Sequence, residues 1–139
     1  MSARFFALAA AAAATTSPAL AADITGLWAT GSEGGRVEIY RCGKAYCGRV
    51  ADAARLRINP DLRDVRNSNP ALRDRRLKGL VVLQGFTGGP REWKGGPVYD
   101  PESGDGAKTG YLKLLSDNKL ELKGCVAFFC RTKVWTRLR

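Results

Sequence analysis

The residues of this chain best suited to covalent chemistry are four cysteines, which form two equally spaced pairs. Four residues separate Cys42 from Cys47, and four separate Cys125 from Cys130. In an exported chain an even number of cysteines indicates disulfides, whereas a four-cysteine zinc site prefers two-residue spacing. Three pairings are possible, and local geometry favours Cys42–Cys47 and Cys125–Cys130. With four-residue hairpin loops, each pair would face directly across its ladder on the outer face of the sheet.

Other chemistry is sparse. The chain has no histidine, which excludes Ser-His-Asp triads and histidine-based metal sites. Oxidised cysteines leave no thiolate nucleophile. The best acidic cluster is Asp100, Glu102 and Asp105, but its spacing misses that of an EF-hand and matches an ordinary turn. We therefore predict no catalytic residue, no metal and no cofactor, and expect that the protein is not an enzyme.

The first 22 residues have the pattern of a secretory signal peptide. Arg4 precedes an apolar run at 5–14, and Pro18 is followed by a small-x-small motif at 19–21. The run is about 10 residues, shorter than the ~20 that span a bilayer. We expect cleavage after residue 21 or 22, a periplasmic or secreted location, and a single mature domain at 23–139.

The chain is strongly basic, with a net charge of +10 at pH 7. Such a charge often indicates nucleic acid as a partner. Export argues against that partner and leaves anionic lipid, lipopolysaccharide, cell-wall polymer or an acidic protein. The alternative is a charged surface that only keeps the protein solvated.

Strand patterns dominate the mature chain, as short runs of β-branched, aromatic and leucine residues divided by glycine. They predict eight strands, at 25–30, 36–42, 47–51, 77–86, 92–99, 111–115, 119–125 and 131–138. This spacing indicates an all-β fold, a small antiparallel barrel of about eight strands. The stretch 53–76 is rich in arginine and has no clear periodicity. We expect it to form one long connection, with a short helix near 60–65.

Two motifs at the ends of the mature chain resemble the calycin (lipocalin-like) pattern. Gly-Leu-Trp at 26–28 opens the first predicted strand, and Trp-Thr-Arg at 135–137 lies in the last. In calycins an early Gly-x-Trp packs beneath an arginine from a late strand. The resemblance implies that Arg137 stacks on Trp28 and closes the floor of the barrel.

A larger set of motifs resembles the uncharacterised bacterial DUF2147 family across nearly the whole mature chain. In order they are Gly-Leu-Trp (26–28), Val-Glu-Ile-Tyr-Arg-Cys-Gly (37–43), Cys-Gly (47–48), Asn-Pro-Ala-Leu-Arg-Asp-Arg (69–75), Trp-Lys-Gly-Gly (93–96), Tyr-Asp-Pro (99–101), Leu-Lys-Gly-Cys (122–125), Cys-Arg (130–131) and Trp-Thr-Arg (135–137). The resemblance implies a small exported β-domain and brings no established activity or catalytic residue. Arg76 departs from the family pattern, which has proline there.

The expected hairpin registers place cations on an apolar face. If Cys125 faces Cys130, Lys133 lies opposite Leu122, and a two-residue turn at 117–118 places Lys113 opposite Leu122 on the other side. Such a face suits an amphiphilic anion such as a fatty acid. A β-bulge in this register, or lysines that extend to the rim, would remove the site. The predicted ligand-binding residues are Lys113, Lys133, Arg137, Trp135 and Trp28.

Two segments are candidates for contact with a partner. One is the end of the arginine-rich connection, with Arg73, Arg75 and Arg76, although interleaved aspartates could neutralise it. The other is the apolar loop at 126–129, with Phe128 and Phe129. We expect this loop to tuck against its own domain, and the alternative is peripheral contact with a membrane or a partner.

The sequence therefore predicts an exported, non-enzymatic binding protein of the bacterial envelope, for a small amphiphilic or anionic ligand. The alternative is an envelope protein–protein interaction or inhibitor module. A continuous apolar cavity would support the first function, and a filled barrel with a rigid exposed loop would support the second.

Overall fold

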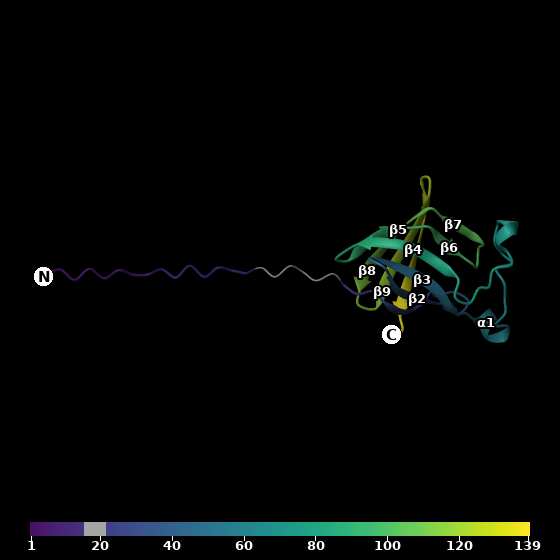
Figure 1. The fold of residues 1–139 in the computed structure, drawn as a ribbon, viewed down its shortest axis with the longest axis horizontal. Coiled ribbons are helices and arrows are strands. Elements are labelled where there is room, and N and C mark those ends of the chain that lie inside the picture. Colours follow the sequence, from purple (N-terminus) through teal and green to yellow (C-terminus); the bar gives the residue numbers. More distant parts are fainter. Residues whose placement is uncertain (16–21) are drawn as a thin grey trace.

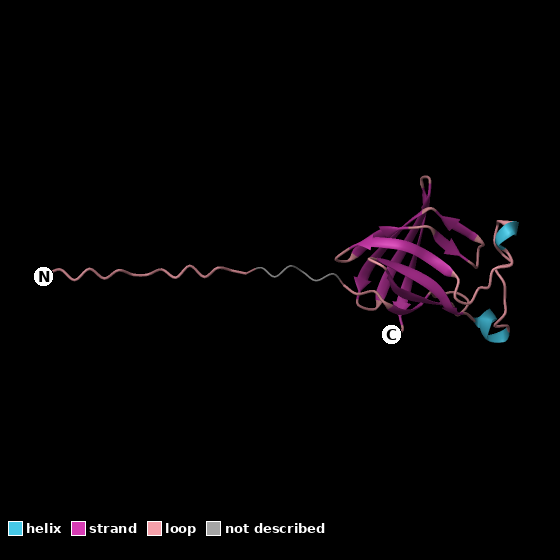
Figure 2. Ribbon diagram, in the orientation of Figure 1, coloured by secondary structure: helices cyan, strands magenta, loops and turns pink. Residues whose placement is uncertain are grey.

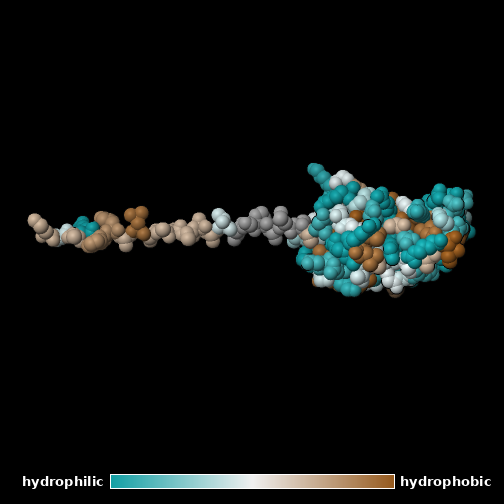
Figure 3. All heavy atoms as spheres, turned by 90° about the horizontal axis from the view of Figure 1, so that it is seen from below, coloured by the Kyte–Doolittle hydropathy of each residue, from teal (hydrophilic) through white to brown (hydrophobic). Residues whose placement is uncertain are grey.

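The computed structural model describes residues 1–15 and 22–139. Residues 1–15 are exposed and contain no helix or strand (Figures 1 and 3). The cleavage motif predicted at 19–21 lies outside the described residues. At the start of the second described range, the Ala22 amide donates a hydrogen bond to the Pro90 carbonyl at 2.9 Å. Among the residues described, no helix has the length and apolar character needed to cross a membrane.

Eight antiparallel strands close into a barrel (Figures 1 and 2). Around the barrel they are β3 (Ala45–Asp52), β2 (Arg36–Cys42), β1 (Gly26–Ala29), β10 (Phe129–Arg137), β9 (Lys119–Val126), β8 (Thr109–Ser116), β5 (Glu92–Gly95) and β4 (Val81–Gly88), with β4 paired to β3. A short hairpin of β6 (Val98–Asp100) and β7 (Asp105–Ala107) continues from β4. The predicted all-β barrel of about eight strands is confirmed.

The expected single strand at 92–99 was wrong, because the chain breaks into β5 and β6. Gly96 has a φ of 140°, which is outside the range of an extended strand. Pro97 follows it and has no amide hydrogen to donate to a ladder. The strand β7 had no counterpart in the sequence prediction.

The closed end of the barrel is a packed core. Trp28, Phe86, Leu112 and Leu120 are among its fully buried side chains. Beneath them the Arg137 guanidinium lies 4.4 Å from the centre of the Trp28 ring. It also donates hydrogen bonds to three backbone carbonyls, those of Asp23, Thr25 and Asp117. The floor expected from the calycin pattern is therefore present.

Both predicted disulfides are present, Cys42–Cys47 and Cys125–Cys130. In each hairpin they lie on the outer face, because their neighbours in sequence alternate with them into the interior. The first register was wrong: Cys42 pairs with Ala45 and Cys47 with Tyr40. Gly43 has a φ of 69°, which allows a two-residue turn in place of the expected four-residue loop. Rings this small stabilise the fold by about 2 kcal/mol each in the chain-entropy model.

The long connection between β3 and β4 contains two short helical turns, α1 (Ala54–Ile58) and a 3-10 turn at Pro70–Leu72. The prediction of a short helix near 60–65 was wrong, because neither turn covers these residues. Asn59 is extended before Pro60, as the residue before a proline prefers. The Asn59 side chain then accepts a hydrogen bond from the Asp61 amide at 3.0 Å, an Asx turn that competes with a helix.

Candidate functional site

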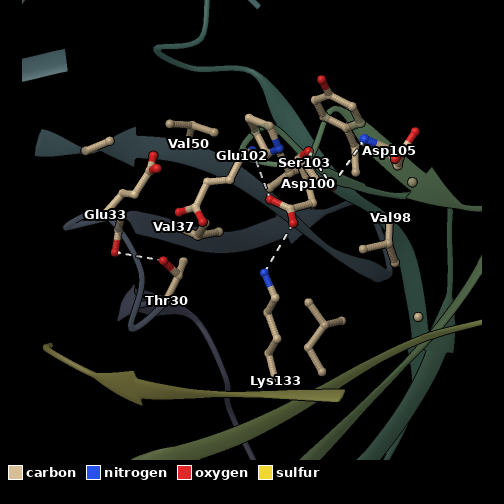
Figure 4. A pocket seen from close by; sticks show the side chains of 18 of the residues that line it. Thr30, Glu33, Val37, Val50, Val98, Asp100, Glu102, Ser103, Asp105 and Lys133 are labelled. Atoms are coloured by element: carbon tan, nitrogen blue, oxygen red, sulfur yellow. Dashed lines mark hydrogen bonds and ion pairs between the residues drawn. The ribbon is translucent and has the colours of Figure 1, made fainter. Parts of the chain in front are cut away.

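The open end of the barrel contains a cavity of about 630 Å³. This volume lies within the ~300–1,000 Å³ range of small-molecule sites. Its inner wall is apolar, with Val37, Val50, Val82, Leu122 and Trp135 among the lining residues. Charged side chains surround its rim, among them Glu33, Asp100, Glu102, Asp105 and Lys133 (Figure 4). The barrel is thus packed at one end and hollow at the other.

Strand β10 supplies four side chains to this cavity, because alternate residues of a strand point to the same face. From the inner wall to the mouth they are Trp135, Lys133, Arg131 and Phe129. Trp135 is 5% exposed, so the aromatic residue at the inner end is buried. A ligand lying along this strand would contact the indole of Trp135 at its inner end and the two cations nearer the mouth.

The carboxylates of the rim are largely engaged within the protein. Asp100 lies 3.2 Å from Lys133 Nζ, Asp52 lies 2.9 Å from Arg57 Nε, and Glu33 lies 3.4 Å from Arg66 Nη1. Glu102 accepts a hydrogen bond from Ser32 at 2.6 Å. In contrast, the lining residues Arg36, Arg55 and Arg131 form no ion pair within residues 1–15 and 22–139. The cations therefore have more capacity for a ligand than the carboxylates.

A buried carboxylate fastens the long connection to this end of the barrel. Asp64 is 1% exposed and accepts a 2.6 Å hydrogen bond from the Tyr99 hydroxyl. Its second oxygen accepts hydrogen bonds from Asn67 at 2.9 Å and Arg75 at 3.0 Å. Since Tyr99 belongs to β6 and lines the cavity, this network holds one wall of the cavity in place.

The same network predicts a loss of stability at alkaline pH. Burial, and then hydrogen bonding to Asp64, raise the pKa of Tyr99 above its ordinary value. The folded state keeps this proton when the unfolded chain loses it, so stability falls as pH rises above the unfolded pKa of about 10. We expect an added slope of about 1.4 kcal/mol per pH unit, which Tyr99→Phe removes.

Urea unfolding at a series of pH values between about 9 and 11 measures this slope. All other tyrosines and lysines are common to both proteins and cancel in the comparison. Equal slopes in the wild type and Tyr99→Phe would show that Tyr99 ionises as easily in the folded protein as in the unfolded chain.

The structure brings together only part of the predicted ligand site. Lys133 and Trp135 line the cavity, whereas Trp28 and Arg137 form the floor of the packed core beneath it. The prediction for Lys113 was wrong: it pairs with Glu121 on the outer surface, with its Nζ 3.7 Å from Glu92. A bulge between Leu114 and Ser116 shifts β8 by one residue, and a one-residue shift reverses the faces.

Arg131 and Tyr99 were not predicted. Arg131 could have been found, because it lies two residues from Lys133 on the same strand face. Tyr99 could not, because the β6–β7 hairpin reaches the cavity only through tertiary packing.

The arginines expected to contact a partner bind within their own connection. Arg73 donates to the Asn67 carbonyl at 2.8 Å, Arg75 pairs with Asp64, and Arg76 pairs with Asp61 at 2.6 Å. Interleaved aspartates thus neutralise Arg75 and Arg76, which is the alternative that the sequence analysis gave to contact with a partner.

The apolar loop does not tuck against the domain, so this expectation was wrong. Phe128 is fully exposed and Phe129 is 83% exposed. Val126 pairs with Phe129, which leaves a turn of only two residues, too short to fold back onto the barrel.

The described residues contain no group of three or more metal-ligating side chains placed to hold a metal ion.

Comparisons with known proteins agree with the fold. A family model described as "Uncharacterized protein conserved in bacteria (DUF2147)" matches residues 26–137. Among solved structures, the chain is similar to protein HP1028 of Helicobacter pylori, described as belonging to the lipocalin family. The two are 23% identical, the TM-score is 0.70, and the alignment covers 84% of each chain. No curated protein matches the chain. Since the family match runs from β1 to the end of β10, this lipocalin-like barrel belongs to the DUF2147 family.

Proposed function

We propose that this protein is an exported, non-enzymatic binding protein for a small amphiphile with an anionic head group. The observation that carries the proposal is the cavity of about 630 Å³, which is apolar inside and has Lys133 and Arg131 above Trp135. The apolar part of the ligand would cover Trp135, Leu122 and the valines, and its head would lie between the two cations. A filled barrel would instead have favoured a protein-interaction module.

An anionic head fits this rim better than a cationic one. Arg131 forms no ion pair with any described residue, whereas three of the five lining carboxylates already contact an arginine or a lysine. A cationic head would have to displace one of these partners. An anion can bind Arg131 directly and share Lys133 with Asp100, through charge-assisted hydrogen bonds.

The rest of the chain supports an exported binding protein. The two disulfides suit an oxidising compartment, and the signal-like segment at 1–22 would be removed there. The packed core at the closed end and the Asp64 network at the open end hold the cavity in a preformed shape, which lowers the cost of binding.

Displacement of a fluorescent fatty acid by three amphiphiles of equal chain length tests the proposal. We expect dodecanoate to bind at least about ten-fold more tightly than dodecanol, because only its head forms charge-assisted hydrogen bonds. Dodecylammonium should bind more weakly still. Arg131→Gln should remove most of the preference for dodecanoate and leave the affinity for dodecanol unchanged.

Equal affinities for all three amphiphiles would contradict the anionic head group and leave a purely apolar site. No displacement by any of them, with the fluorescent fatty acid itself unbound, would contradict the binding function.

A further inference from the structure

The turn between β9 and β10 exposes an unusual amount of apolar surface. This tip consists of Val126, Ala127, Phe128 and Phe129, and it stands clear of the barrel (Figure 1). Phe128 is 100% exposed, Phe129 is 83% exposed and Val126 is 60% exposed. Exposed apolar clusters of this kind mark contact with a partner or a membrane.

The tip is held in its exposed position. The Cys125–Cys130 disulfide joins the strands directly beneath it, with 4.1 Å between the two Cα atoms. Ala127 completes the two-residue turn with a φ of 53°. The phenylalanines therefore cannot withdraw by fraying of the hairpin, and their exposure is a property of the fold.

The strand segments next to the tip carry cations, whereas the rim carboxylates Asp100 and Asp105 lie on the β6–β7 hairpin. The sequence has no aspartate or glutamate at 122–139, and none at 106–116 in the neighbouring segment. Next to the tip, Arg131 pairs with Gly124, Lys123 pairs with Thr132, and Lys108 precedes Thr109, the partner of Cys125. All three cations are exposed or partly exposed.

We propose that the tip docks this protein onto a bilayer rich in anionic phospholipid. Phe128 and Phe129 enter the interfacial region, where amphipathic and aromatic groups are favoured, and Lys108 and Lys123 contact the lipid phosphates. A second copy of the chain suits this surface less well, because two chains of net charge +10 repel each other.

Docking would also orient the cavity. Val126 and Phe129 belong both to the tip and to the lining of the cavity, so the mouth would open beside the membrane surface. Membrane docking does not depend on the proposed ligand and is tested without it.

Vesicle flotation with the disulfide-bonded domain tests the proposal. We expect binding to vesicles of phosphatidylglycerol and phosphatidylcholine at least ten-fold tighter than to pure phosphatidylcholine, and weaker binding as salt is raised. Phe128→Ser should weaken binding at least about five-fold. Ile58→Ser is the matched control, since Ile58 is 87% exposed on α1, a helix that lies away from the tip (Figure 1). The binding of this variant should equal that of the wild type.

A tryptophan at the tip gives a second readout. Phe128→Trp should show a blue shift with anionic vesicles and quenching by brominated lipid, as expected for an indole that leaves water. Phe128→Ser should still bind dodecanoate like the wild type in the absence of vesicles, because Phe128 does not line the cavity.

Three results would overturn membrane docking. They are wild-type protein that stays off anionic vesicles, Phe128→Ser that binds them as tightly as the wild type, and a wild-type dimer in light scattering that Phe128→Ser converts to a monomer. The last result would assign the tip to a second copy of the chain.

Discussion

Asp64→Ala is expected to lower the free energy of unfolding by about 3 kcal/mol. The carboxylate is 1% exposed and accepts hydrogen bonds from Tyr99, Asn67 and Arg75. Alanine would leave these three donors without their acceptor. Asn67 is itself only 3% exposed, so its side-chain amide would remain buried without the carboxylate acceptor.

Asp61→Ala is the matched control for this change. Asp61 lies in the same connection and pairs with an arginine, Arg76, but its side chain is 77% exposed. Exposed ion pairs contribute about 0–1 kcal/mol, so this variant should unfold almost like the wild type. Urea unfolding of both variants measures the difference. Equal stabilities of Asp64→Ala and Asp61→Ala would show that the buried network does not hold the connection.

Gly124→Leu is expected to weaken the binding of dodecanoate at least about ten-fold, with little change in stability. Gly124 lines the cavity on β9, where it is the cross-strand partner of Arg131 on β10. A Cβ at this position would lie 3.5 Å from the Ala107 Cβ, an ordinary van der Waals contact. The φ of Gly124 lies outside the left-handed range. A leucine here therefore fits the backbone and fills the space beside the proposed head-group site.

Thr132→Leu serves as the control for added apolar volume. Thr132 neighbours Arg131 on β10 and pairs with Lys123 on the outer face, so its leucine would point away from the cavity. Titration of the fluorescent fatty acid into both variants, followed by displacement with dodecanoate, measures the affinities. Undiminished affinity in Gly124→Leu would place the ligand elsewhere on the protein.

The two variants also separate the wall of the cavity from its interior. Asp64→Ala should loosen the connection and weaken binding only through the shape of the cavity. Gly124→Leu should occupy the cavity in a domain that remains as stable as the wild type.

The barrel and its covalent links could be predicted from the order of residues along the chain. Alternation of apolar and polar residues is a local property of each strand, so β2, β9 and β10 could be predicted closely from residues that are neighbours in the chain. The disulfides were predictable for the same reason, because each closes a short hairpin. The stacking of Arg137 on Trp28 followed from a motif that pairs the first and last strands.

How these elements form a site depends on contacts between strands that are far apart in the sequence. One bulge in β8 places Lys113 on the outer surface, and nothing in the alternation of that strand shows where a bulge lies. The burial of Asp64 depends on β6 meeting a connection whose own sequence has no periodicity. Whether a barrel is hollow depends on the summed volumes of side chains from all its strands, so the cavity beside Trp135 could only be found once the strands were assembled.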